Sequence, residues 1–149
     1  MKTDAMASPK KKVSRGRLKT RLWDLMSLYI RLKESDELGY VSCVTCGKTS
    51  YFRDGMQAGH WVPKKKGNAI YFLEDNIHTQ CVRCNHFESG NLRAYDDFML
   101  RNYGQKRMDE ILALAGTVYK LTIPHMLDLE AEVKSKLHDE LAKRPGVTL

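Results

Sequence analysis

Hydrophobic residues recur at helical spacing early in the chain. Between about Ser14 and Ser35, apolar side chains stand three or four residues apart, as on one face of a helix. They are Leu18, Leu22, Leu25, Met26, Tyr29 and Leu32. Ser14 can cap the first turn, and Gly39 lies just past the far end. The pattern predicts an N-terminal helix over residues 15–36.

Residues 41–91 lack this periodicity. They are rich in Gly, Cys and Asn and contain short β-prone stretches, YVSCVTC at 40–46 and AIYFLE at 69–74. Such segments separated by turn-forming residues are typical of short strands. We therefore expect hairpins built around a site, with few helices, in this part of the chain.

Helical spacing returns after Gly90. One predicted helix covers residues 92–102 and stops before Gly104, and a second covers 105–114 and stops before Gly116. Together with the hairpins, these helices predict the fold class α+β.

A last helix is predicted from Thr122, which can cap it with Pro124 in the first turn, to a point before Pro145. Its apolar stripe is Met126, Leu129, Val133, Leu137 and Leu141. A stripe of this kind is usually a packing surface. It could pack on the core of the same chain or on a second copy.

Length and composition limit the architecture. The 149 residues allow one domain, and 42% hydrophobic with 29% charged residues is ordinary for a folded chain. No apolar run approaches the ~20 residues that span a bilayer. The N-terminus shows no apolar stretch behind its charges, so no secretory signal is expected. We expect a cytoplasmic protein without a membrane partner.

The net charge of +7 is concentrated at the N-terminus. Residues 1–21 contain eight Lys or Arg and one Asp, while the remaining charges cancel. Residues 1–14 are predicted to be a disordered basic tail. Basic side chains release counterions from nucleic-acid phosphates, which favours DNA binding by Lys10, Lys11, Lys12, Arg15 and Arg17. The alternative is a tail that only improves solubility.

Four cysteines form two CxxC pairs, Cys43 with Cys46 and Cys81 with Cys84, separated by 34 residues. Two such turns complete the four-thiolate tetrahedral shell that Zn²⁺ prefers. A closed shell has no open position, so this zinc would be structural. A redox role for one pair is the alternative, but two pairs make it less favoured.

Polar residues between and after the cysteines follow the order of the HNH nuclease motif. His60 lies between the pairs, Asn76 stands five residues before the third cysteine, and Asn85 follows the fourth. The run QAGHW…EDNIHTQCVRCNHFESGN resembles the HNH segment of phage recombination endonucleases of the lambda NinG (Rap) type. The resemblance covers about residues 40–105.

The resemblance implies a ββα-metal fold clamped by zinc, with a catalytic Mg²⁺ or Mn²⁺ at the hairpin–helix junction. In it, His60 would be the general base, Asn76 would orient the loop or the histidine, and Asn85 would place an oxygen on the catalytic ion. Together, the charge pattern, the helical periodicity and the resemblance divide the chain into 1–14 (disordered basic tail), 15–36 (N-terminal helix), 40–104 (HNH core with the four-cysteine zinc site) and 105–149 (C-terminal helical region).

The acidic ligand of the catalytic ion is not identified by the resemblance. Many HNH nucleases have Asp one or three residues before the catalytic histidine, where this chain has Gly59 and Gln57. Gln57 offers an oxygen without charge, and Glu88 stands one helical turn after Asn85. Gln57 and Glu88 are therefore the candidate ligands, with Asp54 and Asp75 as further possibilities.

The sequence thus predicts a metal-dependent DNA endonuclease. Lys64, Lys65 and Lys66 are expected to contact phosphate at the hairpin tip. The resemblance implies branched substrates such as Holliday junctions or D-loops, and two symmetric cuts favour a homodimer. The alternatives are a non-catalytic zinc module that binds nucleic acid and a protein-interaction zinc module of the treble-clef kind.

Overall fold

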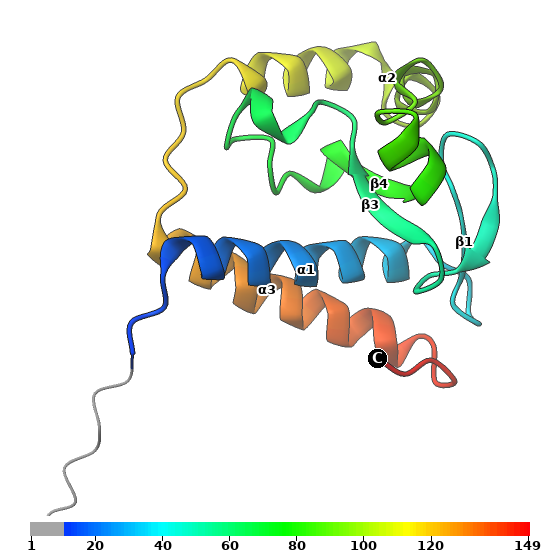
Figure 1. The fold of residues 1–149 in the computed structure, drawn as a ribbon, viewed down its shortest axis with the longest axis horizontal. Helices are drawn as coiled ribbons and strands as arrows, with labels where there is room; N and C mark the ends of the chain where they lie inside the picture. The colour runs from blue at the N-terminus through cyan, green and yellow to red at the C-terminus, as the bar shows by residue number, and fades with distance from the viewer. Residues whose placement is uncertain (1–10) are drawn as a thin grey trace, which may run out of the picture.

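The computed structural model describes residues 11–149. Residues 1–10, which include Lys10 and most of the predicted tail, lie outside the described residues. Helices surround two small antiparallel sheets, so the predicted α+β class is confirmed (Figure 1). Within residues 11–149, no helix combines the length and the apolar character needed to cross a membrane.

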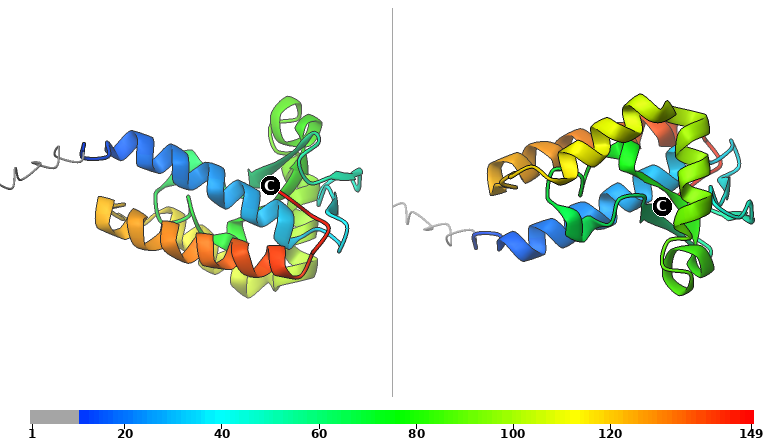
Figure 2. Two further views of the ribbon diagram at one scale, coloured as in Figure 1. Left: turned by 90° about the horizontal axis from the view of Figure 1, so that it is seen from below. Right: turned by 90° about the horizontal axis from the view of Figure 1, so that it is seen from above.

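Two long helices lie side by side along one side of the molecule (Figures 1 and 2). Helix α1 spans Arg15–Lys33, and Ser14 caps it by accepting a hydrogen bond from the backbone N–H of Arg17. Helix α3 spans Ile123–Ala142 and is capped by Thr122 in the same way. Both begin where the caps in the sequence predict.

The apolar stripes of α1 and α3 share one core. Leu22 and Met26 of α1 and Met126 and Val133 of α3 are each at most 1% exposed. The sequence left open whether the stripe of α3 packs on its own chain or on a second copy, and the structure shows it packed within the chain. The same core also contains hairpin residues such as Val41, Phe52 and Ile77. The two helices and the hairpins therefore cover the stripes together within one chain.

Two hairpins lie beyond this helix pair. Strands β1 (Tyr40–Ser42) and β2 (Thr49–Tyr51) form one antiparallel sheet. Strands β3 (Met56–His60) and β4 (Ile77–Cys81) form the other, which packs on α1. In the second sheet Gln57 pairs with Gln80 and Gly59 pairs with His78. Paired residues point to the same face, so Gln57, Gly59 and Gln80 lie together.

The expectation of a strand at 69–74 is wrong. This segment forms turns that lead into the short 3-10 helix η2 (Glu74–Asn76). Local backbone bonds hold it, such as Tyr71 N–H to the carbonyl of Asn68. Its β-prone residues are apolar because they cover the core, where Ile70 is fully buried.

The remaining elements follow the second hairpin. A 3-10 turn, η1 (Lys64–Lys66), lies in the long loop between β3 and β4. After β4 comes a single π-helical turn, η3 (Arg83–Phe87), and then α2 (Leu92–Ala115). The axis of α2 is broken at Gly104, whose φ of 80° suits glycine, at the point where the sequence predicts two helices.

Candidate active site

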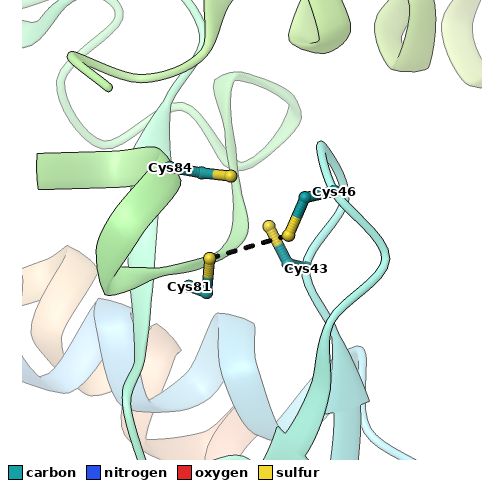
Figure 3. Close-up of side chains that lie close together, drawn as sticks. All are labelled: Cys43, Cys46, Cys81 and Cys84. Atoms are coloured by element: carbon teal, nitrogen blue, oxygen red, sulfur yellow. Dashed lines mark hydrogen bonds between the residues drawn. The ribbon is translucent and has the colours of Figure 1, made fainter. Parts of the chain in front are cut away.

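The four cysteines form one cluster at the base of the second hairpin (Figure 3). Cys43 and Cys46 come from the turn between β1 and β2, and Cys81 and Cys84 from the end of β4 and from η3. Their four sulfur atoms lie within 4.8 Å of one another, and Cys46 Sγ is 3.7 Å from Cys81 Sγ. Zn–S bonds of ~2.3 Å in a tetrahedron give S···S edges of about 3.8 Å. The cluster can therefore hold a metal ion such as zinc.

The thiols differ in their ease of ionisation. Burial opposes ionisation of Cys43, but hydrogen bonds from the Thr45 hydroxyl and from neighbouring backbone N–H groups lower its pKa to about 6. The pKa of Cys46 is raised to about 12, first by burial and then by the surrounding sulfur atoms. Several thiolates close together repel one another. A cation bound among the four sulfur atoms would offset this repulsion and favour the thiolate forms that bind metal.

His60, the last residue of β3, is held in one tautomer. Its Nε2 lies 2.8 Å from the backbone carbonyl oxygen of Tyr71. A carbonyl oxygen only accepts hydrogen bonds, so Nε2 carries the proton and Nδ1 keeps a free lone pair. On its face, the imidazole stacks on Trp23 of α1. The neutral ring is thus oriented to accept a proton at Nδ1.

The surroundings of His60 favour this neutral form. Burial lowers its pKa to about 4, and the nearby charge of Lys64 also lowers it, whereas the hydrogen bond to Tyr71 acts in the opposite direction. The imidazole is therefore uncharged throughout the neutral pH range, and its low pKa makes it a weaker base than an exposed histidine.

Asn76 fixes the loop that orients His60. Its side chain is fully buried, and its Oδ1 accepts a hydrogen bond from Val62 N–H at 2.8 Å. Its Nδ2 donates to the carbonyl oxygens of Val62 and Ile70, at 3.0 and 3.2 Å. The loop is therefore closed next to Tyr71, whose carbonyl holds His60. The orienting role that the resemblance implies for Asn76 stays a prediction.

Asn85, in η3, lines the same cavity as His60. The cavity has a volume of about 260 Å³ and is lined by Trp23, Ala58, His60, Pro63, Lys64, Asn85, Ser89, Gly90 and Leu92. Asn85 Nδ2 donates to Gln57 Oε1 at 2.8 Å. The structure thus brings His60 and Asn85 to one cavity. The Gln57 oxygen that was a candidate metal ligand accepts a hydrogen bond from Asn85.

A basic and aromatic rim borders this cavity. The Lys19 ammonium lies 4.1 Å from the centre of the Tyr71 ring, and the Lys64 ammonium lies 5.9 Å from it. Burial lowers the pKa of Lys19, and repulsion from Arg15 and Lys64 lowers it further. Positive charges that repel one another beside a cavity form a site that an anion would stabilise.

The sequence model of the family described as "Bacteriophage Lambda NinG protein" matches residues 4–143. The chain belongs to the NinG family. It is 32% identical over 114 residues to protein ninG of Escherichia phage lambda. These 114 residues are 76% of this chain and 52% of the relative. Protein ninG of Salmonella phage P22 is 30% identical over 114 residues, which are 76% of this chain and 53% of that relative.

These NinG relatives are longer proteins. The chain spans about half the length of the curated NinG proteins it matches, so the comparison concerns that shared part. No solved structure matches the chain.

The structure places Glu88 away from the cavity. The turn that carries Asn85 is π-helical, so Glu88 does not share its face. The exposed Glu88 carboxylate pairs with Arg83 at 3.3 Å. To bind a metal ion at Asn85, the Glu88 carboxylate would first have to break its ion pair with Arg83.

The other two histidines of the segment have different environments. His78 is buried and bonds Glu34 Oε1 at 2.6 Å and the carbonyl oxygen of Asp75 at 3.1 Å, so it ties β4 to the end of α1. His86 is exposed on η3. His78 thus has a structural position, and His86 does not line the cavity.

The basic residues expected to bind DNA are spread over two elements. Lys64 lines the cavity, and Lys65 and Lys66 are exposed on η1 beside it. Arg15 and Arg17 are exposed in the first turn of α1. Lys11 and Lys12 are exposed just before that helix.

Sequence reasoning missed Trp23 and Lys19 as site residues. Trp23 lies on α1, and its ring lines the cavity against His60. Arg15, Lys19 and Trp23 are spaced by four residues, so a helix places them on one face. That spacing was a usable signal, but nothing in the sequence showed that this face meets the β3–β4 hairpin.

Proposed function

We propose that this NinG protein is a metal-dependent DNA endonuclease of the HNH type. The observation that carries the proposal is the state of His60. Its Nε2–H is fixed on the Tyr71 carbonyl, its Nδ1 is free, and it shares a cavity with Asn85. A neutral, oriented imidazole in a cavity with a basic rim suits the activation of water against a phosphodiester.

The order of the elements supports a ββα-metal core. The β3–β4 hairpin is followed by η3, and the cysteine cluster joins η3 to the β1–β2 turn. We propose that Zn²⁺ in this cluster is structural, because four thiolates leave no open position for a substrate. Zinc would hold η3 against the hairpin and thereby keep Asn85 beside His60.

In the proposed reaction, His60 Nδ1 takes a proton from the water that attacks the phosphorus. Lys19 and Lys64 hold the phosphate backbone at the rim of the cavity. Asn76 keeps the loop closed, so that the histidine does not change tautomer. A Mg²⁺ or Mn²⁺ ion bound near Asn85 would supply charge stabilisation for the phosphate and the leaving oxygen.

The proposed substrate is branched DNA, such as a Holliday junction or D-loop, on the strength of the family resemblance. A homodimer remains part of the proposal, because paired symmetric cuts need two active sites and the described residues form one such cavity. The dimer interface would lie outside the apolar stripes of α1 and α3, because these stripes are buried within one chain. The exposed side chains of Leu100 and Leu112 on α2 are candidates.

Cleavage assays on linear, nicked and four-way-junction DNA, with and without Mg²⁺, test the proposal. His60→Ala should reduce cleavage by roughly 10²-fold or more, the contribution of a positioned general base, while DNA binding persists. His86→Ala is the matched control, since His86 is exposed and outside the cavity. Wild-type cleavage by His60→Ala would show that the base lies elsewhere.

A second candidate is a non-catalytic zinc module that binds nucleic acid. One observation favours it: among residues 11–149, no carboxylate lines the cavity. Mg²⁺ sites usually contain one or two carboxylates. This alternative predicts tight binding of junction DNA with no Mg²⁺-dependent cleavage by the wild-type protein.

A further inference from the structure

A second groove adjoins the cavity that holds His60 and Asn85. Two residues, Pro63 and Leu92, line both the cavity and this groove. The two sites therefore share a wall. A ligand larger than one phosphate group can reach from the cavity into the groove across this wall.

The surface of the groove is mostly apolar. Trp61 and Val62, which follow His60 directly in the chain, are 5% and 6% exposed and form its floor. Leu92 and Leu112 of α2 border it and are 44% and 50% exposed. An apolar group that fills the groove removes this surface from water, which is favourable. The groove volume of about 310 Å³ is at the lower end of the roughly 300–1,000 Å³ of ligand sites and suits a small, flat group.

The turn η1 supplies one positive charge to each of the two sites. Lys64 lines the cavity, and Lys66, two residues later, lines the groove. Successive phosphates along a nucleic-acid strand each carry a negative charge. A strand with one phosphate at Lys64 and the next at Lys66 would cross the shared wall, and the base between them would lie beside the groove.

Asp96 gives the groove a hydrogen-bond acceptor. Its Oδ1 accepts the indole N–H of Trp61 at 2.7 Å. The side chain is exposed on α2, so its Oδ2 can accept a second hydrogen bond from a ligand. Carboxylates accept hydrogen bonds from the exocyclic amino group of cytosine. The groove thus combines apolar walls with one cation for a phosphate and one acceptor for the edge of a base.

We propose that this groove binds one unpaired base of the DNA strand whose phosphate occupies the cavity, and that Asp96 selects a base with an exocyclic amino group. The inference rests on the proposed function, because it requires DNA at the cavity. Bringing a base out of a duplex costs free energy, and this cost is least for a base that is already unpaired. A base site next to His60 would therefore favour branched DNA over a continuous duplex.

The two tryptophans of the chain report on the two sites separately. Trp23 lines the cavity, and Trp61 lines the groove. Their indole N–H signals can be followed by NMR, without added divalent cation, while a short duplex with one unpaired cytosine is titrated in. We expect both signals to shift and to saturate together, because the base binds the Asp96 carboxylate that accepts the Trp61 N–H. The same duplex without the extra cytosine should shift the Trp23 signal alone.

The identity of the unpaired base tests the role of Asp96. Uracil has a carbonyl oxygen where cytosine has its amino group. We expect the wild-type chain to bind the duplex with an unpaired cytosine at least about fivefold more tightly than the duplex with an unpaired uracil, the effect of one hydrogen bond. Fluorescence anisotropy of labelled DNA measures both affinities.

Asp96→Asn should reverse this preference. The Trp61 N–H still needs an acceptor, so the amide oxygen takes the place of Oδ1 and the NH₂ group takes the place of Oδ2. The groove then offers a donor, which matches uracil. Asp97→Asn is the matched control, because Asp97 is the next exposed carboxylate on α2 and does not line the groove. It should keep the preference for cytosine, and thermal unfolding shows whether each variant is folded.

The outcomes separate this inference from the proposed function. A shift of Trp23 without one of Trp61 overturns the base site and leaves the nuclease proposal standing. A shift of Trp61 with a cytosine preference, in a protein that cuts no DNA, supports the base site and refutes the nuclease. Equal affinities for the two bases in the wild-type chain overturn the role of Asp96. A Trp61 signal that moves with protein concentration and not with DNA would show a second copy in the groove, which also overturns the proposal.

Discussion

The imidazole of His60 stacks on the indole of Trp23, with ring centroids 4.7 Å apart and planes 18° apart. The two residues come from different elements, β3 and α1, so the stack joins the hairpin to the helix pair. Trp23 covers one face of the ring and adds to the burial that lowers the His60 pKa to about 4. The helix therefore sets both the position and the charge state of the proposed base.

Replacing this tryptophan should alter the titration of His60. In Trp23→Ala, water reaches the exposed face of the ring, so we expect the His60 pKa to rise from about 4 toward 6.5. NMR of the imidazole carbons during a pH titration measures it. Trp23→Phe keeps an aromatic face and should change the pKa less. An unchanged pKa in Trp23→Ala would show that other neighbours bury the ring.

The depressed pKa of His60 predicts how stability depends on pH. Between pH 6.5 and about 4 the unfolded chain binds a proton at His60 that the folded protein does not. The free energy of unfolding should therefore fall as the pH decreases through this window, and His60 should contribute no such change above it. Denaturant unfolding at pH 7 and pH 5 measures the loss. The loss should be smaller in His60→Ala, and an equal loss would contradict the assigned pKa.

Metal removal should affect the hairpin and η3 first. We expect one tightly bound Zn²⁺ per chain, and Cys43→Ser or Cys84→Ser should unfold the central segment. Elemental analysis and circular dichroism, before and after chelation, measure both effects. Adding Zn²⁺ back should restore the fold of the wild-type protein. Freshly purified protein without zinc, or a well-folded Cys43→Ser variant, would refute the structural site.

The basic rim should contribute to DNA affinity more than other surface lysines. Lys19→Gln and Lys64→Gln should each weaken binding and reduce the salt dependence of log K by roughly 0.9, the value for one phosphate contact. Lys106→Gln, on α2 and outside the cavity lining, is the matched control. Filter binding at several salt concentrations measures the slopes. If the salt dependence of log K were the same in all three variants, DNA would not contact Lys19 or Lys64.

The basic N-terminal segment can be tested separately. Deleting residues 1–13, which contain Lys10, Lys11 and Lys12, should weaken DNA binding at low salt. Cleavage at saturating DNA should change little, because phosphate contacts position the substrate without taking part in the chemistry. Equal affinities of the truncated and full-length chains would show that the segment does not bind DNA.

The proposed homodimer can be tested by its mass in solution. A homodimer should give about twice the chain mass of 17.1 kDa in light scattering, alone or with junction DNA. Leu112→Lys should reduce that mass if the exposed apolar side chains of α2 form the interface. A mass that stays at the monomer value when junction DNA is added would rule the homodimer out.

The sequence by itself determined the features that depend on local spacing. Helical periodicity and side-chain caps located the beginnings of α1 and α3 at Ser14 and Thr122. The spacing of the cysteines predicted their clustering, because a CxxC turn can present two sulfur atoms to one ion. The order of His60 and Asn85 around these pairs led to the expectation that they share a site, and both line one cavity.

Only the tertiary structure decided which partners these residues have. AIYFLE is apolar in sequence whether it pairs as a strand or covers a core. In the structure it forms turns, and Asn76 Nδ2 donates a hydrogen bond to the Ile70 carbonyl oxygen. The stacking of Trp23 on His60 and the hydrogen bond from Trp61 to Asp96 join residues far apart in the chain. Such contacts are set by the packing of helix against hairpin, because local periodicity specifies which face of an element is apolar but not what lies against it.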